Sequence, residues 1–146
     1  MVEATDMETD RQAIADVVRD YYESWNEGDA DRMGRSLHTD LAKRAPIAAL
    51  LAIGARQAGD PDGLDEDNRQ SMVEATARGV GAKRATTPED RAIEVEIDDA
   101  YQWIASVTVR SSVYREYLHL VRTSQGWKIV NALWQRTPRE GGDGAG

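Results

Sequence analysis

The sequence contains neither cysteine nor phenylalanine. Without cysteine, a disulfide scaffold and any metal or redox site built on thiolates are excluded. Without phenylalanine, the bulk of the core must come from four tryptophans, five tyrosines and the aliphatic residues. No stretch approaches the roughly 18 consecutive apolar residues of a membrane span. The acidic start also lacks the apolar run of a secretory signal, so we expect a cytoplasmic protein.

Positive charge is also scarce, with 18 Lys and Arg against 26 Asp and Glu and a net charge of -8. Nucleic acids and anionic membranes both require a basic footprint, so neither is an expected partner. The length of 146 residues and the 40% hydrophobic content suit one globular domain. We place this domain at 9–137, between disordered tails at 1–8 and 138–146. No phosphate-binding loop or metal-ligand spacing occurs, and neither a metal nor a cofactor is predicted.

The first third of the chain has the pattern of two helices. Thr9 and Gln12 have the spacing of a capping box, and Gly28 is a typical helix stop. Between these positions, apolar residues recur at the three- and four-residue spacing of an amphipathic helix: Ile14, Val17, Val18, Tyr21, Tyr22 and Trp25. Asp29 then caps a second, shorter helix that ends at about Leu37.

The middle of the chain is the least regular part. Pro46 suits the first turn of a short apolar helix, and the GDPDG sequence at 59–63 is typical of a turn. A third helix is predicted from about Asp65 to Arg78, where Gly79 and Gly81 stop it.

The last third predicts four antiparallel strands, at about 91–98, 101–110, 111–123 and 126–136, with turns at 98–100 and 124–126. The first strand alternates between apolar and acidic residues, whereas both faces of the last two are apolar. A sheet that is covered on both faces loses its alternation, and the helices can cover only one face. We therefore expect a second copy of the chain on the outer face, in a homodimer.

The faces of the last two strands can be assigned by alternation. Tyr114, Leu118 and Leu120 share one face, and Val113, Tyr117, His119 and Val121 share the other. In the final strand, Trp127, Ile129, Asn131 and Leu133 are expected opposite Lys128, Val130, Ala132 and Trp134.

Two segments carry a family resemblance: DYYESWNEGDADRMGRSLHTDLAKR at 20–44 and YREYLHLVRTSQGWKIVNALW at 114–134. They resemble the nuclear transport factor 2-like superfamily, which includes ketosteroid isomerase and the SnoaL-type cyclases. Within it, they are most similar to a bacterial family called putative lumazine-binding. The resemblance implies an α+β cone-shaped fold, in which three N-terminal helices pack on a strongly curved antiparallel sheet. It also implies a conical, apolar pocket with a few polar groups.

Seven residues are candidates for binding a ligand: Tyr21, Tyr22, Trp25, His38, Tyr117, His119 and Asn131. Three of these, His38, His119 and Tyr22, are candidates for acid–base chemistry. Each has a structural alternative. The aromatic residues of the first helix can be core, and His38 can cap a helix or lie at the surface. The last three either line the pocket or belong to the dimer interface.

Three charged residues also have two interpretations. Glu116 shares a face with Leu118 and Leu120, so it is either a buried base or half of a salt bridge with a cross-strand arginine, which we favour. Lys43 and Arg44 either neutralise an anionic ligand or, as is more common, are solvated.

Three functions are consistent with the sequence. The first is a domain that binds a small planar or hydrophobic molecule without assigned chemistry. The second is a cofactor-free isomerase, cyclase or dehydratase for a hydrophobic carbonyl compound. The third is a dimeric interaction module whose pocket is filled by side chains. Fold alone does not decide between them.

Overall fold

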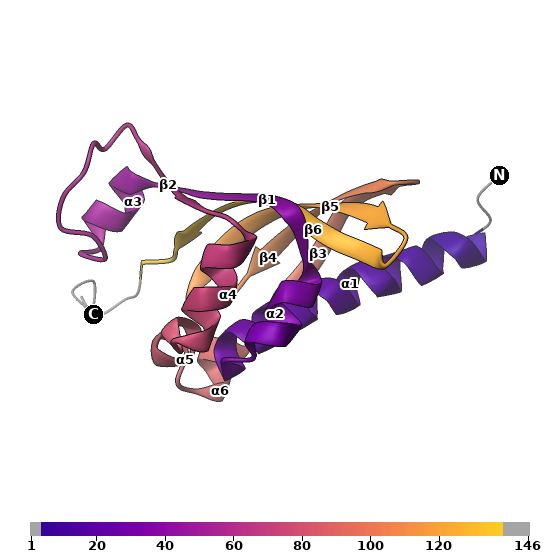
Figure 1. Cartoon of the computed structure of the whole chain (residues 1–146), viewed down its shortest axis with the longest axis horizontal. Helices are drawn as coiled ribbons and strands as arrows, with labels where there is room; N and C mark the ends of the chain where they lie inside the picture. Colours follow the sequence, from indigo (N-terminus) through magenta and orange to yellow (C-terminus); the bar gives the residue numbers. More distant parts are fainter. Residues whose placement is uncertain (1–3, 139–146) are drawn as a thin grey trace.

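A computed structural model describes residues 4–138, in which a layer of helices covers one face of a curved sheet (Figure 1). The six-stranded sheet has the order β2-β1-β6-β5-β4-β3. Only the β1–β6 pair is parallel among the described strands. The helices are α1 (Ala4–Glu27), α2 (Ala30–Ser36), α3 (Ile47–Ala52), α4 (Arg69–Ala77), α5 (Val80–Arg84) and α6 (Pro88–Arg91). The strands are β1 (Leu37–Pro46), β2 (Leu64–Asp67), β3 (Glu94–Tyr101), β4 (Ile104–Arg110), β5 (Tyr114–Thr123) and β6 (Gly126–Arg136). The predicted α+β fold is confirmed.

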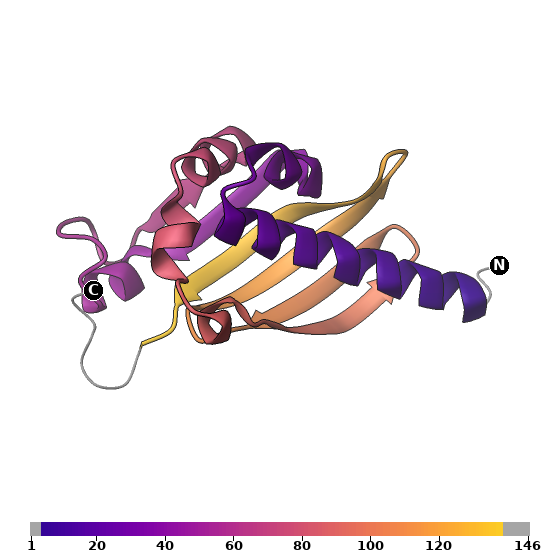
Figure 2. The same ribbon diagram turned by 90° about the horizontal axis from the view of Figure 1, so that it is seen from below.

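Helix α1 lies across the concave face of the sheet (Figure 2). Its predicted apolar stripe is buried there, with Ile14 and Val18 fully buried. The helix ends before Gly28, which adopts a left-handed φ of 76° as expected for a stop. Its start differs from the prediction, because α1 begins at Ala4 and passes through the capping positions proposed at Thr9 and Gln12. The remaining tail residues at 1–3 and 139–146 lie outside the described residues.

Two strands were not predicted. Strand β1 follows α2 directly, and β2 pairs with it where the third helix was expected to begin. The helix there begins later, at Arg69, because Asn68 provides the cap and forms a capping box with Ser71. Strand β1 pairs with β6, which is far away in the sequence, and β2 pairs with β1 across the irregular middle of the chain. Local periodicity therefore did not indicate either strand.

The first hairpin of the sheet also turns later than predicted. Its turn lies at Gln102, which has a φ of 46°, and not at 98–100. The register shifts between Ile97 and Asp99, so Asp98 is an extra residue in β3. The second predicted turn is confirmed, since Thr123 pairs with Gly126 across Ser124 and Gln125.

A β-bulge in β6 changes which of its side chains face the helices. Leu120 pairs with Ile129 and His119 pairs with Asn131, so Val130 is an extra residue. Before the bulge, Trp127 and Ile129 are buried on the same face, as predicted. After it, Ala132 and Trp134 are buried in their place. The predicted assignment of the β6 faces was therefore wrong beyond Ile129, and the bulge brings Trp134 to the concave side.

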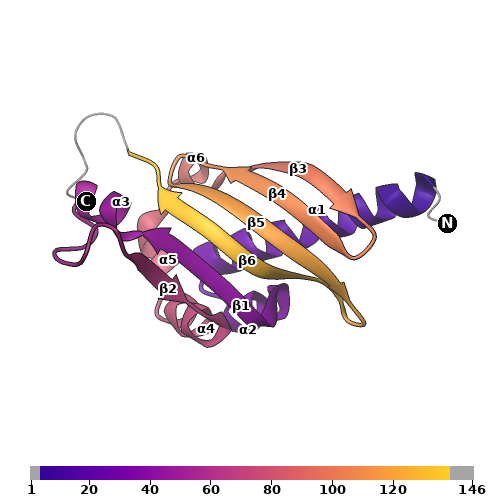
Figure 3. The same ribbon diagram turned by 90° about the horizontal axis from the view of Figure 1, so that it is seen from above.

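The convex face of the sheet carries no helix among the described residues (Figure 3). Large apolar side chains are half exposed on it, including Tyr117, Leu133 and Ile104. Within residues 4–138, no helix is long and apolar enough to cross a membrane.

Candidate functional site

A cavity of about 370 Å³ lies beside α3, α4 and α5. In Figure 1, these helices are at the end of the molecule opposite the N-terminal end of α1. The cavity floor is formed by the concave face of β1, β5 and β6, and one wall by α1. Its rim is formed by the α3–β2 segment and by the end of α4 with α5. The irregular middle of the sequence therefore forms the opening of the site.

A buried carboxylate lies at the centre of the floor. Glu116 of β5 is only 2% exposed. The Tyr21 hydroxyl donates to its Oε2 at 2.8 Å, and the Tyr22 hydroxyl donates to its Oε1 at 2.7 Å. Lys43 of β1 lies with its Nζ 3.1 Å from the same Oε2 and also donates to the Tyr21 hydroxyl. The charge of Glu116 is thus neutralised and hydrogen-bonded by three side chains, as a buried charge requires.

The two tyrosine hydroxyls are held in their neutral form. Burial raises the pKa of Tyr21 and of Tyr22 well above the usual value, and the negative charge of Glu116 raises both further. Each tyrosine therefore keeps its proton at neutral pH and serves as a hydrogen-bond donor.

Aromatic rings surround this polar cluster. The Trp25 indole donates to the Tyr114 hydroxyl at 2.9 Å. The rings of Tyr114 and Trp134 meet edge to face, with centroids 5.9 Å apart. Lys43 Nζ lies 5.0 Å from the centroid of the Trp134 ring, in a cation–π contact. The Nε1 of Trp134 is buried and has no partner within the described residues.

The rim carries charged side chains. Arg56 pairs with Asp65 at 3.2 Å, and Asp67 accepts a hydrogen bond from the Ser71 hydroxyl at 2.8 Å. Arg78 and Arg84 also line the cavity. Among the described residues, no group of three His, Asp or Glu side chains is arranged to hold a metal ion.

The candidates on α1 lie at the cavity, and the others do not. Tyr21, Tyr22 and Trp25 line it while also packing in the core, so both interpretations of these residues apply. His38 lines a separate hollow beside α2, where its Nδ1 accepts from the Asp40 backbone at 3.0 Å.

The remaining three candidates lie on the convex face of the sheet. Tyr117 is 49% exposed there. His119 Nδ1 lies 3.3 Å from Asn131 Nδ2 on the same face. These residues are therefore on the side of the sheet that was expected to form a dimer interface, and Tyr22 is the only acid–base candidate at the cavity among the described residues.

Two predictions about charged residues were wrong. Lys43 was expected to be solvated but is only 8% exposed. Glu116 is buried, but its partner is Lys43 and not a cross-strand arginine. Leu41, Lys43 and Ala45 are buried at a spacing of two, so Lys43 lies on the inward face of β1.

Comparison with known proteins gives a family and a fold. The profile of a family described as putative lumazine-binding matches residues 9–135. A structure of a nuclear transport factor 2-like protein of unknown function from Shewanella baltica OS155 is 12% identical, with a TM-score of 0.62. That alignment covers 95% of this chain and 100% of the other.

Other solved structures are similarly related. A nuclear transport factor 2-like protein of unknown function from Silicibacter pomeroyi DSS-3 has 12% identity and a TM-score of 0.60, over 93% of this chain and 100% of that one. A structure described as a putative aromatic ring hydroxylase, from Novosphingobium aromaticivorans, has 15% identity and a TM-score of 0.56, over 90% and 91%.

At these identities, structural similarity establishes the fold and not the activity. A comparison with curated proteins finds no match. The profile match spans nearly the whole described chain, including every residue that lines the cavity. The chain therefore belongs to the putative lumazine-binding family, and its fold is that of nuclear transport factor 2-like proteins.

Proposed function

We propose that this protein binds a small planar organic molecule in the cavity above Glu116. The observation that carries this proposal is an open, aromatic-walled cavity with a fully paired polar cluster at its floor. Ligand sites are typically such concave surfaces, mostly apolar with a few convergent polar groups. The third hypothesis required a pocket filled by side chains, and an unfilled volume of about 370 Å³ argues against it. We also propose that the protein is located in the cytoplasm, as its sequence predicts.

Ligand binding is tested by thermal unfolding in the presence of a compound panel. The panel contains planar heterocycles such as lumazine, aromatic ketones, and aliphatic compounds of matched volume. A planar ligand at 100 times its Kd should stabilise the fold by about 2.7 kcal/mol, which raises the midpoint by several degrees.

The matched control places a bulky side chain in the cavity. Ala75 lines the cavity from α4, so Ala75→Phe should remove the ligand-induced shift while near-ultraviolet circular dichroism shows an intact fold. A panel without any stabilising compound, or an equal shift in the Ala75→Phe variant, would contradict the proposal.

A second candidate function is proton transfer on a carbonyl compound. It is favoured by the placement of a buried carboxylate, Glu116, beside the protonated hydroxyl of Tyr22 in the same cavity. Glu116 would accept the proton from carbon. The Tyr22 hydroxyl, which donates to Glu116 in this structure, would then turn to donate to the developing enolate oxygen. Exchange of α-hydrogens for deuterium in a bound ketone, followed by NMR, distinguishes catalysis from binding, and Glu116→Gln should abolish the exchange.

We also propose that the convex face of the sheet is a homodimer interface. Support comes from Tyr117 at 49%, Leu133 at 46% and Ile104 at 57% exposure on this one face. Such an apolar surface favours association with an identical copy. Light scattering at micromolar concentration should give twice the chain mass of 16.2 kDa.

Substitution at the centre of this face should dissociate the dimer. Tyr117→Glu places a charge beside Leu133, its cross-strand neighbour, and should yield a monomer. Met7→Glu introduces the same charge at a residue of α1 that is 47% exposed, and should leave the dimer intact. A monomeric wild-type protein would refute the proposal.

A further inference from the structure

The cavity is lined by more cationic than anionic side chains. In a chain of net charge -8, this cavity is lined by four cations and three carboxylates: Lys43, Arg56, Arg78, Arg84, Asp65, Asp67 and Glu116. Lys43 pairs with Glu116, and Arg56 pairs with Asp65. Asp67 is hydrogen-bonded by Ser71. Within residues 4–138, no ion pair or side-chain hydrogen bond engages the guanidinium of Arg78 or of Arg84.

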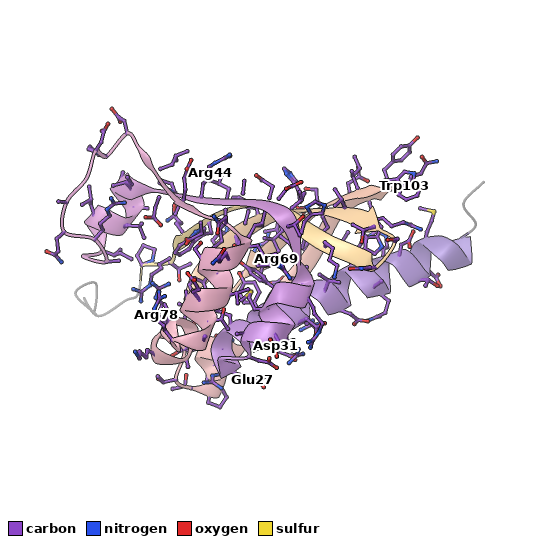
Figure 4. All side chains as sticks on the ribbon, viewed as in Figure 1. Glu27, Asp31, Arg44, Arg69, Arg78 and Trp103 are labelled. Atoms are coloured by element: carbon purple, nitrogen blue, oxygen red, sulfur yellow. The ribbon has the colours of Figure 1, made fainter. Side chains whose placement is uncertain are left out.

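The chain path brings Arg78 and Arg84 to the same part of the cavity lining. Arg78 follows α4 directly as its C-cap, and Arg84 ends α5. Gly79 joins the two helices with a φ of 78°, a conformation that folds α5 back beside α4. In Figure 4, Arg78 lies on the side of α4 that is nearer to α3, which forms the facing part of the rim.

One polar atom behind the cavity wall also has no partner among the described residues. Trp134 is 9% exposed, and its buried indole N–H finds no acceptor among the described residues. That nitrogen has almost no accessible surface, so a ligand in the cavity meets the ring of Trp134 and not its N–H.

We infer that the ligand of this cavity is an aromatic anion, whose ring packs against Trp25, Tyr114 and Trp134 and whose charged group binds Arg78 and Arg84. This inference rests on the proposed binding function and adds the ligand's chemical class. Guanidinium groups bind planar oxyanions in a bidentate manner, so a carboxylate, sulfonate or phosphate fits the rim. Lys43 pairs with Glu116 and Arg56 with Asp65, and Asp67 offsets one of the two remaining arginines. The cavity lining therefore carries one net positive charge, which favours an anion.

Two fluorescent probes that differ by one charged group test this inference. 1-Anilinonaphthalene-8-sulfonate is an aromatic anion, and N-phenyl-1-naphthylamine is its neutral counterpart without the sulfonate. Each is titrated by fluorescence into the wild-type protein, into Arg78→Gln/Arg84→Gln and into Ala75→Phe. Arg44→Gln is the matched control, because Arg44 is exposed and pairs with Glu66 away from the cavity.

The expected result is selective weakening of the anionic probe. Each arginine would form charge-assisted hydrogen bonds with the sulfonate, so loss of both should raise the Kd of the sulfonate probe by at least about tenfold. The neutral probe should keep its Kd in that variant, and Arg44→Gln should change neither value. Ala75→Phe should weaken both probes.

The outcomes separate this inference from the function on which it rests. If the neutral probe binds as tightly as the sulfonate and the double arginine variant changes neither Kd, the inference is overturned while cavity binding stands. If Ala75→Phe leaves both probes bound as in the wild type, the cavity is not the site and the proposed function fails. Unchanged near-ultraviolet circular dichroism in every variant excludes binding to an unfolded state.

Discussion

Lys43→Met is expected to lower the free energy of unfolding by about 3–5 kcal/mol, because it leaves the carboxylate of Glu116 buried without its cation. Methionine has a similar length and fills the same space, so the loss reports the missing charge and not a cavity. The measurement is urea-induced unfolding at neutral pH, with the slope of the transition compared between variants.

A double variant isolates the interaction between the two side chains. Lys43→Met/Glu116→Gln removes both charges, while the Gln side-chain oxygen can still accept a hydrogen bond from a tyrosine hydroxyl. Because the replacement of a buried ion pair by neutral groups is often nearly neutral in stability, this variant should recover much of the loss.

A neighbouring ion pair provides the control. Arg44 is adjacent in β1 and pairs with Glu66 at the surface, so Arg44→Met should cost no more than about 1 kcal/mol. Equal losses for Lys43→Met and Arg44→Met, or a double variant less stable than Lys43→Met, would show that the buried pair does not organise the cavity floor.

Gly81→Ala is expected to be the most disruptive change of a single methyl group at the cavity wall, at about 2–4 kcal/mol. A Cβ at this position would lie 2.6 Å from the Trp25 indole Nε1 and closer still to the Trp25 carbonyl oxygen. Either α5 moves away from α1 or the indole moves, and the second movement breaks its hydrogen bond to Tyr114.

Stability and probe binding should therefore fall together in this variant. Urea unfolding measures the first, and titration with N-phenyl-1-naphthylamine measures the second. Gly79→Ala is the matched control, because no atom lies within 4 Å of its Cβ position and only the left-handed φ of 78° opposes the substitution. That strain is about 1–2 kcal/mol and leaves Trp25 in place. A Gly81→Ala variant as stable as Gly79→Ala, with unchanged probe affinity, would contradict the close packing of α5 on α1.

Sequence patterns predicted the parts of the site that depend on local spacing. The stripe on α1 placed Tyr21 and Tyr22 on the buried face, and the alternation of β5 placed Glu116 with Leu118 and Leu120. Lys43 was missed because β1 was not recognised as a strand. Without that strand, the buried Glu116 had no identifiable partner, and a cross-strand arginine was the ordinary choice.

The sequence by itself determined the α+β class, the limits of α1 and α2 at Gly28 and Asp29, and the hairpin that turns after Thr123. These features follow from capping, turn chemistry and periodicity, which act over a few neighbouring residues. Only the tertiary structure decided that Lys43 meets Glu116 and that Trp134 faces the cavity. Both depend on pairings between distant segments, and one extra residue at Val130 reverses the faces of a strand without any local sign in the sequence.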